Sequence, residues 1–313
     1  MLLFALTLAL IPPGCGEGGG ERPSDRSMMV TDRAGREVEI FGKPERIAAL
    51  APFAVEMLQG LGVEPVMRAS VRGETPEAWS SIPELPISHG AGPEMERLVA
   101  SRPDLVILPE PFAHFASSVG SATGAPVLVL DVRTLDEARL MFEVLGVLTG
   151  RMDRAVELVG ELDRRVAAVV AEVPGAGSGD GPGVFALFGT PDAFYAFLPD
   201  SYLGDLASLL GATLVTEGLP EDRSFGGFAQ FSLETVVSRD PDVLLIVTHG
   251  GVADGVIERL QRDPAWRGLR AVREGRVGVL SDDLFVLRPG ASPAEAMALL
   301  HGALYPERVG DGG

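Results

Sequence analysis

The sequence predicts an α/β protein made of two lobes that a long α-helix joins, with a ligand cleft between the lobes. Short apolar runs alternate with helical stretches from Val30 onward. A long amphipathic stretch lies near the middle of the chain, and the blocks on its two sides share a short pattern. The 313 residues suffice for two domains, because single cores seldom grow beyond about 250 residues.

The first 27 residues predict export and not a folded part. Residues 2–11 are apolar, are too short to span a bilayer, and lead through Pro12, Pro13 and Gly14 to Cys15. A polar, glycine-rich segment follows and resembles a tether. We expect a bacterial lipoprotein signal in which Cys15 is lipidated, so that the protein is periplasmic or at the cell surface and contacts the membrane only through this anchor. The alternative is an unmodified cysteine at the end of an ordinary cleaved signal.

Six short apolar runs predict parallel strands that are covered on both faces, since they lack the alternation of a half-exposed strand. The predicted strands are 46–50, 105–108, 127–130, 184–188, 243–247 and 277–280, and the helices between them include 55–61, 136–148 and 202–210.

The segment 153–173 has one narrow apolar stripe. Ala155, Val159, Leu162 and Val166 recur at steps of four and three, which is the spacing of one helix face. Such a helix is about 30 Å long, so we interpret it as a strut between lobes. The alternative is one more helix that packs on a sheet. The predicted domains are 28–150, the joining helix 151–174, and 182–313.

The two blocks repeat one unit. Glu96 precedes Pro103-Asp104 by seven residues and a buried strand follows; Glu234 precedes Pro241-Asp242 in the same way. Proline ends the helix and aspartate begins the turn into the strand. Two copies of one unit predict a pseudo-symmetric bilobal fold.

Ligands of open α/β sheets bind beyond the carboxyl ends of the strands, so the residues after each strand are the candidates. They combine aromatic walls with a few polar groups, which suits a large, partly apolar ligand. The candidates are Phe53, Glu110, Phe112, His114, Thr190, Phe194, Tyr195 and His249.

His114 and His249 occupy matching places in the repeat and could together bind a metal or haem iron. The alternative is that each hydrogen-bonds or packs locally. His89, which precedes a helix, could also reach the cleft.

Several activities are excluded or disfavoured. The 26 Lys and Arg against 44 Asp and Glu give a net charge of −18, which argues against nucleic acid and suits a soluble monomer. A single cysteine excludes an intrachain disulfide and a thiolate cluster. Phosphate loops, nucleophile elbows and metalloprotease helices are missing from the sequence, which favours binding over catalysis.

Several segments resemble the iron-siderophore and cobalamin solute-binding family of ABC importers. The resemblance covers roughly residues 30–308 in order and spacing. It rests on Asp32-Arg-Ala-Gly-Arg36, Pro44-Glu-Arg46, Leu145-Gly-Val-Leu-Thr149, Ser232-Leu-Glu234, Asp263-Pro-Ala-Trp266, Ala271-Val-Arg-Glu-Gly-Arg276, Arg288-Pro-Gly290 and Leu304-Tyr-Pro-Glu307.

The resemblance implies Rossmann-like lobes with parallel-rich sheets and delivery of the ligand to an ABC permease with its ATPase. It also implies docking through surface glutamates, for which Glu96 and Glu234 are the candidates. The alternative role of both is to complement the helix dipole.

For the ligand, the resemblance implies a ferric siderophore or similar metal chelate, whose iron belongs to the ligand, with no intrinsic cofactor. Arg288, with Arg68, Arg72 and Arg223, could bind an anionic chelate. Haem, cobalamin or a bare metal remains an alternative, as does an enzyme on a chelatase-like scaffold or a ligand-free structural lipoprotein.

Overall fold

The computed structural model describes residues 9–11, 27–71, 75–173, 176–177, 180–190, 193–223, 225–248, 255, 257–258, 262 and 264–306. The chain divides into two compact units. Unit 1 is the chain up to Asp131 together with Met141–Glu157, and unit 2 is Val132–Leu140 together with the chain from Leu158 onward. Residues 132–140 thus group with unit 2, and residues 151–157, at the start of the predicted joining helix, group with unit 1. The domain bounds given in the sequence analysis stay a prediction.

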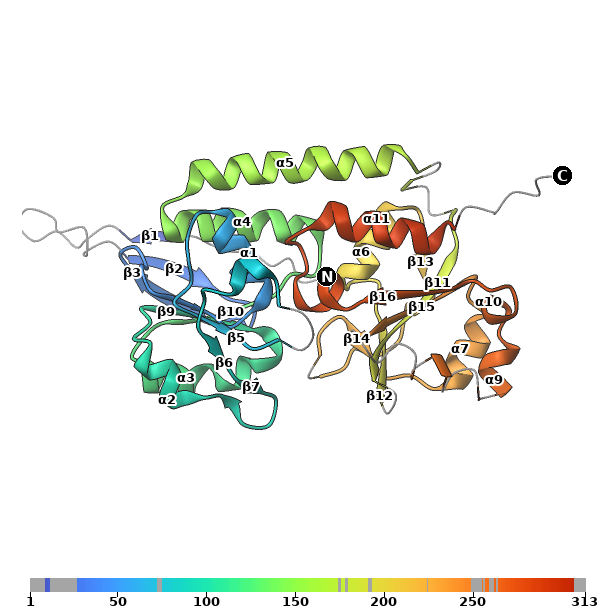
Figure 1. Ribbon diagram of the computed structural model, residues 1–313, viewed down its shortest axis with the longest axis horizontal. Coiled ribbons are helices and arrows are strands. Elements are labelled where there is room, and N and C mark those ends of the chain that lie inside the picture. The colour runs from blue at the N-terminus through green and yellow to red at the C-terminus, as the bar shows by residue number, and fades with distance from the viewer. Residues whose placement is uncertain are drawn as a thin grey trace, which may run out of the picture. The chain divides into compact units, whose positions relative to one another are not determined.

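Unit 1 contains a five-stranded parallel sheet in the order β10-β9-β4-β5-β6. Figure 1 shows α1 on one side of this sheet and α2 and α3 on the other. Its strands and helices are β4 (Ile47–Ala49), α1 (Pro52–Gly60), β5 (Met67–Ala69), η2 (Glu77–Trp79), β6 (Glu84–Leu85), α2 (Met95–Ala100), β9 (Leu105–Pro109), η3 (Glu110–Phe115), α3 (Ala116–Thr123) and β10 (Val127–Leu130). The short pair β7 (Ile87–Ser88) and β8 (Gly92–Pro93) is antiparallel.

A hairpin precedes the sheet: β2 (Ser27–Thr31) pairs antiparallel with β3 (Glu37–Phe41), and the backbone of β1 (Ala9–Ile11) pairs with β2. The buried carboxylate of Asp32 closes the hairpin turn by accepting the backbone N–H groups of Ala34 and Arg36. It also accepts the N–H of Val129 from β10, at 3.1 Å. Asp32 therefore fixes the hairpin to the sheet, which gives the first motif of the resemblance a structural reason.

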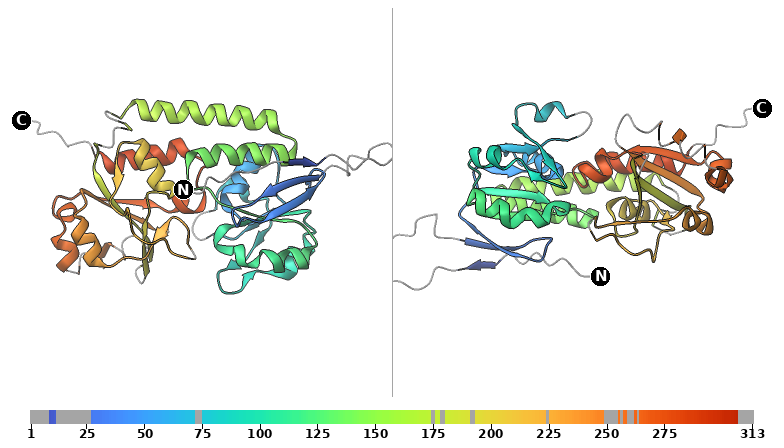
Figure 2. Two further views of the ribbon diagram at one scale, coloured as in Figure 1. Left: turned by 180° about the vertical axis from the view of Figure 1, so that it is seen from behind. Right: turned by 90° about the horizontal axis from the view of Figure 1, so that it is seen from below.

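Unit 2 contains a second sheet in the order β14-β12-β11-β15-β16, with β13 also paired to β11. The strands β11, β13, β15 and β16 are parallel, whereas β12 and β14 run antiparallel to their neighbours. The elements are β11 (Gly183–Thr190), β12 (Ala193–Phe197), α6 (Tyr202–Leu209), β13 (Thr213–Leu214), β14 (Phe228–Ala229), α7 (Leu233–Arg239), β15 (Val243–Thr248), α9 (Pro264–Gly268), α10 (Arg270–Arg273), β16 (Val277–Ser281), the π-helix η4 (Asp283–Leu287) and α11 (Pro293–Leu304). Figure 2 shows α6 and α11 on one side of this sheet and α9 and α10 on the other.

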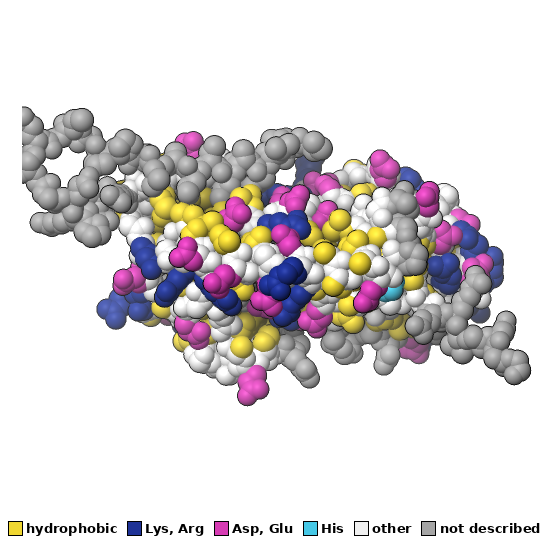
Figure 3. Space-filling view, turned by 90° about the horizontal axis from the view of Figure 1, so that it is seen from above, with side chains coloured by type: hydrophobic (Ala, Val, Ile, Leu, Met, Phe, Trp, Pro, Cys, Tyr) yellow, Lys and Arg dark blue, Asp and Glu magenta, His cyan; other side chains and the backbone are white. Residues whose placement is uncertain are grey.

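Two longer helices follow β10, and they cross the boundary between the units: α4 (Leu135–Thr149) and α5 (Met152–Ala171). They pack together closely, because a Cβ at Gly146 of α4 would lie 2.7 Å from the Cβ of Ala155 on α5. The predicted stripe of α5 is confirmed, since Ala155, Leu162 and Val166 are buried. The other face of α5 carries interspersed acidic and basic side chains (Figure 3).

All six predicted strands are present, with ends that differ by no more than two residues, and each predicted helix has a counterpart. The sequence analysis omitted the hairpin β2–β3 and the antiparallel strand β12. The chain passes between the units within α4 as well as within α5, since residues 132–140 group with unit 2 and residues 141–157 with unit 1.

Candidate ligand-binding surfaces

In unit 1 the candidate site lies beyond β9. This strand is a fully apolar run, and Pro109 and Pro111 then turn the chain into the short helix η3 at its carboxyl end. That helix carries three of the predicted residues. Phe112 is 8% exposed, His114 is exposed, and Glu110 lies with its Oε1 3.9 Å from Nε of Arg33.

Rings from two segments gather around η3. The exposed imidazole of His89, in the β7–β8 turn, stacks on Phe112 with centroids 4.7 Å apart and planes 17° apart. His114 packs on Phe115 at 4.0 Å, and Phe112 and Phe115 are 6.4 Å apart. These four rings, His89, Phe112, His114 and Phe115, are called the unit 1 ring cluster below. His89 was considered only in passing in the sequence analysis, because nothing in the sequence pairs it with Phe112.

The ring cluster depends on a glycine. Gly92 has φ +75°, a left-handed conformation, and a Cβ at this position would lie 2.8 Å from the ring of Phe115. The turn that carries His89 can therefore approach η3 only because residue 92 has no side chain. Phe53 does not join the cluster among the described contacts. It lies in the first turn of α1, where it is 3% exposed and forms part of the core.

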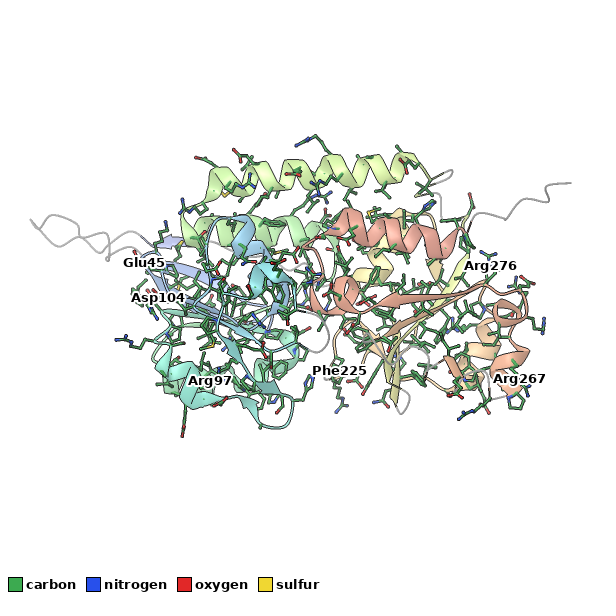
Figure 4. The ribbon with its side chains drawn as sticks, viewed as in Figure 1. Glu45, Arg97, Asp104, Phe225, Arg267 and Arg276 are labelled. Atoms are coloured by element: carbon green, nitrogen blue, oxygen red, sulfur yellow. The ribbon has the colours of Figure 1, made fainter. Side chains whose placement is uncertain are left out.

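In unit 2 the predicted aromatic residues lie on β12. Tyr195 is half-buried with its ring 5.3 Å from that of Phe225, which Figure 4 labels, and Phe194 packs against the core of the unit. Thr190 ends β11, where its backbone pairs with Ala193. The hydroxyl of Thr248, at the end of β15, donates to the carbonyl of Gly189 and so holds the carboxyl ends of β15 and β11 together.

Phe225 was missed in the sequence analysis. It precedes two glycines in the loop before β14, and the only signal was an aromatic residue next to residues of low helix and strand propensity. Phe228, the first residue of β14, packs at 4.7 Å on Phe197 and at 5.7 Å on Phe188. These contacts show that the β11–β12–β14 edge of unit 2 is aromatic.

The predicted Arg288 follows the π-helix beyond β16. Asp283, the first residue of that helix, accepts a hydrogen bond from Nε of Arg288 at 2.8 Å. Its Oδ2 also forms an ion pair with Nη2 of Arg288. The guanidinium is 16% exposed. A bidentate pair of this kind holds a guanidinium in one orientation. Single π-helical turns are frequent at functional sites, which agrees with the place of η4 at a strand end.

The other arginines considered for an anionic ligand have different surroundings. Arg68 is buried, pairs with Glu84 at 2.8 Å and donates to backbone carbonyls, so it serves the fold of unit 1. Arg223 is exposed, and Arg72 lies outside the described residues. Both tryptophans, Trp79 and Trp266, are buried in the cores.

Two predicted residues, Cys15 and His249, lie outside the described residues, as does the side chain of Thr190. Convergence of His114 with His249 therefore stays a prediction. Within the described part of the chain, no three His, Cys, Asp or Glu side chains are grouped so that they could hold a metal ion. In the same part, no helix combines the length and apolar character needed to cross a bilayer.

The candidate docking residues lie at equivalent positions. Glu96 is in the first turn of α2 and Glu234 is in the first turn of α7, and both side chains are exposed. Ser232 caps α7 by accepting the N–H of Thr235. Within the described residues neither glutamate makes an ion pair or side-chain hydrogen bond, so both carboxylates face solvent.

Known proteins of three kinds are similar to this chain. The Fe(3+)-citrate-binding protein YfmC of Bacillus subtilis is 24% identical over 95% of this chain and 94% of its own length. The structure of an ABC-type Fe3+-hydroxamate transport system from Saccharomonospora viridis is 27% identical, covers 88% of this chain and 98% of its own, and superposes with a TM-score of 0.70. The structure of S. aureus IsdE complexed with heme is 19% identical, covers 83% and 98%, and has a TM-score of 0.70.

The fold, the family match and the similar transport proteins identify a substrate-binding protein of the ABC importer class, which implies a membrane permease as partner and a small-molecule chelate as ligand. The chain belongs to the family described as periplasmic binding protein, which matches residues 47–284. This membership confirms the prediction of a carrier and excludes the enzyme alternative. It also supports a place outside the cytoplasm.

Proposed function

We propose that this protein binds a ferric chelate of the siderophore or citrate type for import. The observation that carries the proposal is the unit 1 ring cluster beyond β9, in which the exposed imidazole of His89 stacks on Phe112 and that of His114 packs at a tilt on Phe115. A face of this kind offers apolar contact to the carbon skeleton of a chelate and N–H donors to its oxygens. The similarity to an Fe(3+)-citrate-binding protein and to an Fe3+-hydroxamate transport system supports the same ligand class.

Unit 2 would contribute the aromatic edge with Phe194 and Tyr195 and the guanidinium of Arg288. Asp283 already orients that guanidinium, so little side-chain entropy is lost when an anionic oxygen binds to it. Phe53 and Glu110 would act from behind the contact surface: Phe53 packs in the core at the start of α1, and Glu110 pairs with Arg33. Thr190 and His249 would provide polar contacts at the strand ends.

For delivery, the loaded monomer would dock on the permease through Glu96 and Glu234, and the associated ATPase would drive release. Exposed, unpaired carboxylates on two equivalent helices suit basic side chains on the partner. Lipidation of Cys15 would keep the protein near the permease.

Calorimetric titration with ferric citrate and with a ferric hydroxamate tests the proposal. The wild-type protein should bind one of them saturably at 1:1, while the iron-free chelator binds much more weakly. Phe112→Ala and Arg288→Met should each weaken binding at least tenfold. Arg223→Met, a change of an exposed arginine in unit 2, should leave binding within twofold. Titration heats that show no saturable binding of either chelate would contradict the proposal.

Haem is a second candidate, because His114 and His89 are exposed imidazoles that rest on aromatic rings, a suitable face for a porphyrin. The similarity to the haem-complexed structure adds support for the fold. If haem shifts its Soret band on addition to the wild-type protein, and His114→Ala and His89→Ala abolish the shift, haem is favoured over the ferric chelate. A haem spectrum that the wild-type protein leaves unchanged would exclude haem. His114 with His249 would be the pair to test for a bare metal ion.

A further inference from the structure

The loop before β14 carries Phe225, whose ring contacts that of Tyr195 at the aromatic edge of unit 2. Both rings are half-buried, so each keeps part of its surface for a ligand (Figure 4). Phe225 itself is in no helix or strand, and no ladder of sheet hydrogen bonds fixes it. The contacts that its loop makes elsewhere therefore determine where the ring lies.

The carboxylate of Glu221 closes this loop across its base. Its Oε1 accepts the backbone N–H of Gly227 at 2.6 Å, and the backbone of Glu221 forms an isolated bridge with Ala229. Gly227 is buried in a left-handed conformation with φ +78°, and its carbonyl accepts the N–H of Leu198, 2.9 Å away. Since Gly227 is two residues from Phe225, the bond from Glu221 restricts where the loop can place that ring.

Arg133, which is distant in sequence, holds that carboxylate. Its Nη1 donates to the same Oε1 of Glu221 at 2.8 Å. The arginine side chain is 13% exposed and the glutamate side chain is 44% exposed, so water competes for the carboxylate much more than for the guanidinium. Without this partner the glutamate side chain would regain rotamer freedom toward solvent and would release the N–H of Gly227 more easily.

The backbone of Arg133 is itself fixed. Its N–H donates to Oε2 of Glu137 in the first turn of α4, at 2.7 Å, and the N–H of Glu137 donates to Oγ1 of Thr134. The N–H of Leu135 is bound to Asp205 of α6. The guanidinium therefore extends from an anchored segment of unit 2, and through Glu221 it can fix the loop in turn.

We propose that Arg133 and Glu221 are a positioning pair, which holds the ring of Phe225 against Tyr195 and so raises the affinity for the chelate without contacting it. The inference rests on the proposed function, because it concerns the chelate surface of unit 2 named there. A loop that is ordered before binding loses less conformational entropy when the ligand binds. The pair therefore acts on affinity through the order of the loop.

The test is a double-mutant cycle, measured by calorimetric titration with ferric citrate and a ferric hydroxamate. Arg133→Met keeps the apolar part of the side chain and removes the charge, so it should weaken binding of the preferred chelate about fivefold. Phe225→Ala should weaken binding at least about fivefold. In the Phe225→Ala protein, Arg133→Met should change the affinity by less than about twofold, because the ring through which Arg133 acts is gone.

Hydrogen exchange of the ligand-free protein gives a second readout that does not depend on the ligand. The amides of residues 225–228 should exchange at least about tenfold faster in Arg133→Met than in the wild-type protein. Glu221→Gln keeps an oxygen for the N–H of Gly227 but loses the charge that Arg133 pairs with. It should shift both the exchange and the affinity in the same direction as Arg133→Met.

The matched control is Arg139→Met on α4, which removes an ion pair with Asp163 of α5 of similar length, 2.7 Å. It should leave the loop amides and the chelate affinity within about twofold of the wild-type values. Additive effects of Arg133→Met and Phe225→Ala, or loop amides that exchange as in the wild type, would overturn the inference and leave the proposed function intact. A wild-type protein that binds neither chelate would remove the proposed function, and with it the role in affinity, whatever the loop amides do.

Discussion

Asp104 and Asp242 have the same structural role in the two units: each accepts backbone N–H donation at the start of a neighbouring strand. Asp104 accepts the backbone N–H groups of Glu45 and Arg46, 2.8 and 2.9 Å away, just before β4 (Figure 4). Asp242 accepts the N–H of Gly183, 2.8 Å away, at the start of β11. In each unit the aspartate of the Pro-Asp pair thus joins the beginnings of two neighbouring parallel strands, which explains why the pair occurs twice.

Removal of either carboxylate should therefore destabilise its unit. We expect Asp104→Ala and Asp242→Ala to lower the free energy of unfolding by about 1–2 kcal/mol each, because backbone N–H groups lose a charged acceptor. Urea denaturation measures the effect. Asp153→Ala, at an exposed position of α5, is the control and should change it by less than about 0.5 kcal/mol. Equal stability of all four proteins would contradict this role.

Two residues before each aspartate, the chain takes a left-handed conformation without glycine: Arg102 has φ 46° and Asp240 has φ 41°. Glycine removes this strain, so Arg102→Gly should stabilise the protein by about 0.5–1 kcal/mol in thermal unfolding. Asp240→Gly should gain less, because Asp240 also accepts a hydrogen bond from Arg270 at 3.2 Å. The carbonyl at each position, which accepts from Arg46 or Arg270, is kept in both variants. A larger gain at Asp240 than at Arg102 would refute this explanation.

Two helical glycines should respond to alanine in opposite directions. At Gly146 the added Cβ would meet the Cβ of Ala155 at 2.7 Å, whereas at Gly160 it would meet nothing within 4 Å. Gly146→Ala should therefore destabilise the protein by about 1–3 kcal/mol through overpacking of α4 on α5. Gly160→Ala should stabilise it by about 0.5–1 kcal/mol through helix propensity. Differential scanning calorimetry of both variants measures the contrast, and shifts of the same sign would contradict the packing.

Asp205 should make stability depend on pH. Its carboxylate, on α6, accepts the N–H of Leu135 at the start of α4, at 2.8 Å. Burial raises the pKa of Asp205, with the carboxylates of Asp136 and Glu137 acting in the same direction and the Leu135 N–H and Arg139 acting against them. A raised folded-state pKa gives stability that is present below the unfolded value of about 3.9 and is lost as pH rises through the folded value.

Asp205→Asn keeps the acceptor for Leu135 but cannot ionise. The stability of the wild-type protein relative to this variant should therefore fall as the pH rises from about 4 to 7, as measured by urea unfolding at each pH. The exposed Asp153→Asn variant should run parallel to the wild type. A relative stability that rises with pH would show that the carboxylate is favoured by the fold.

Much of the fold could be predicted because its signals are local. Buried parallel strands are continuous apolar runs, and the stripe of α5 follows one helical period. The hairpin β2–β3 was missed although β3 alternates, with Glu37 and Glu39 exposed and Ile40 buried, because the strand has only five residues and ends on the exposed apolar Phe41. The affiliation of residues 132–140 with unit 2 depends on contacts far apart in sequence, such as that between Leu135 and Asp205, and no local pattern encodes it.

The candidate site was predictable only as a set of loops. Strand ends identified Phe112, His114 and Tyr195, but the partners of these rings come from turns distant in sequence, as His89 and Phe225 do. Arg68 shows the opposite difficulty. Its charge suggested a ligand contact, while its burial beside Trp79 and its pair with Glu84 assign it to the core of unit 1.

The most direct test of the account is calorimetric titration of the wild-type protein and of Phe112→Ala with ferric citrate and a ferric hydroxamate. We predict saturable 1:1 binding of a ferric chelate by the wild-type protein and at least tenfold weaker binding by the variant. The thermal stability of the variant should fall only by the amount that the loss of one buried ring explains. Absence of binding with both chelates, or equal affinity of the two proteins, would contradict the assignment of the unit 1 ring cluster as the surface that binds the ligand.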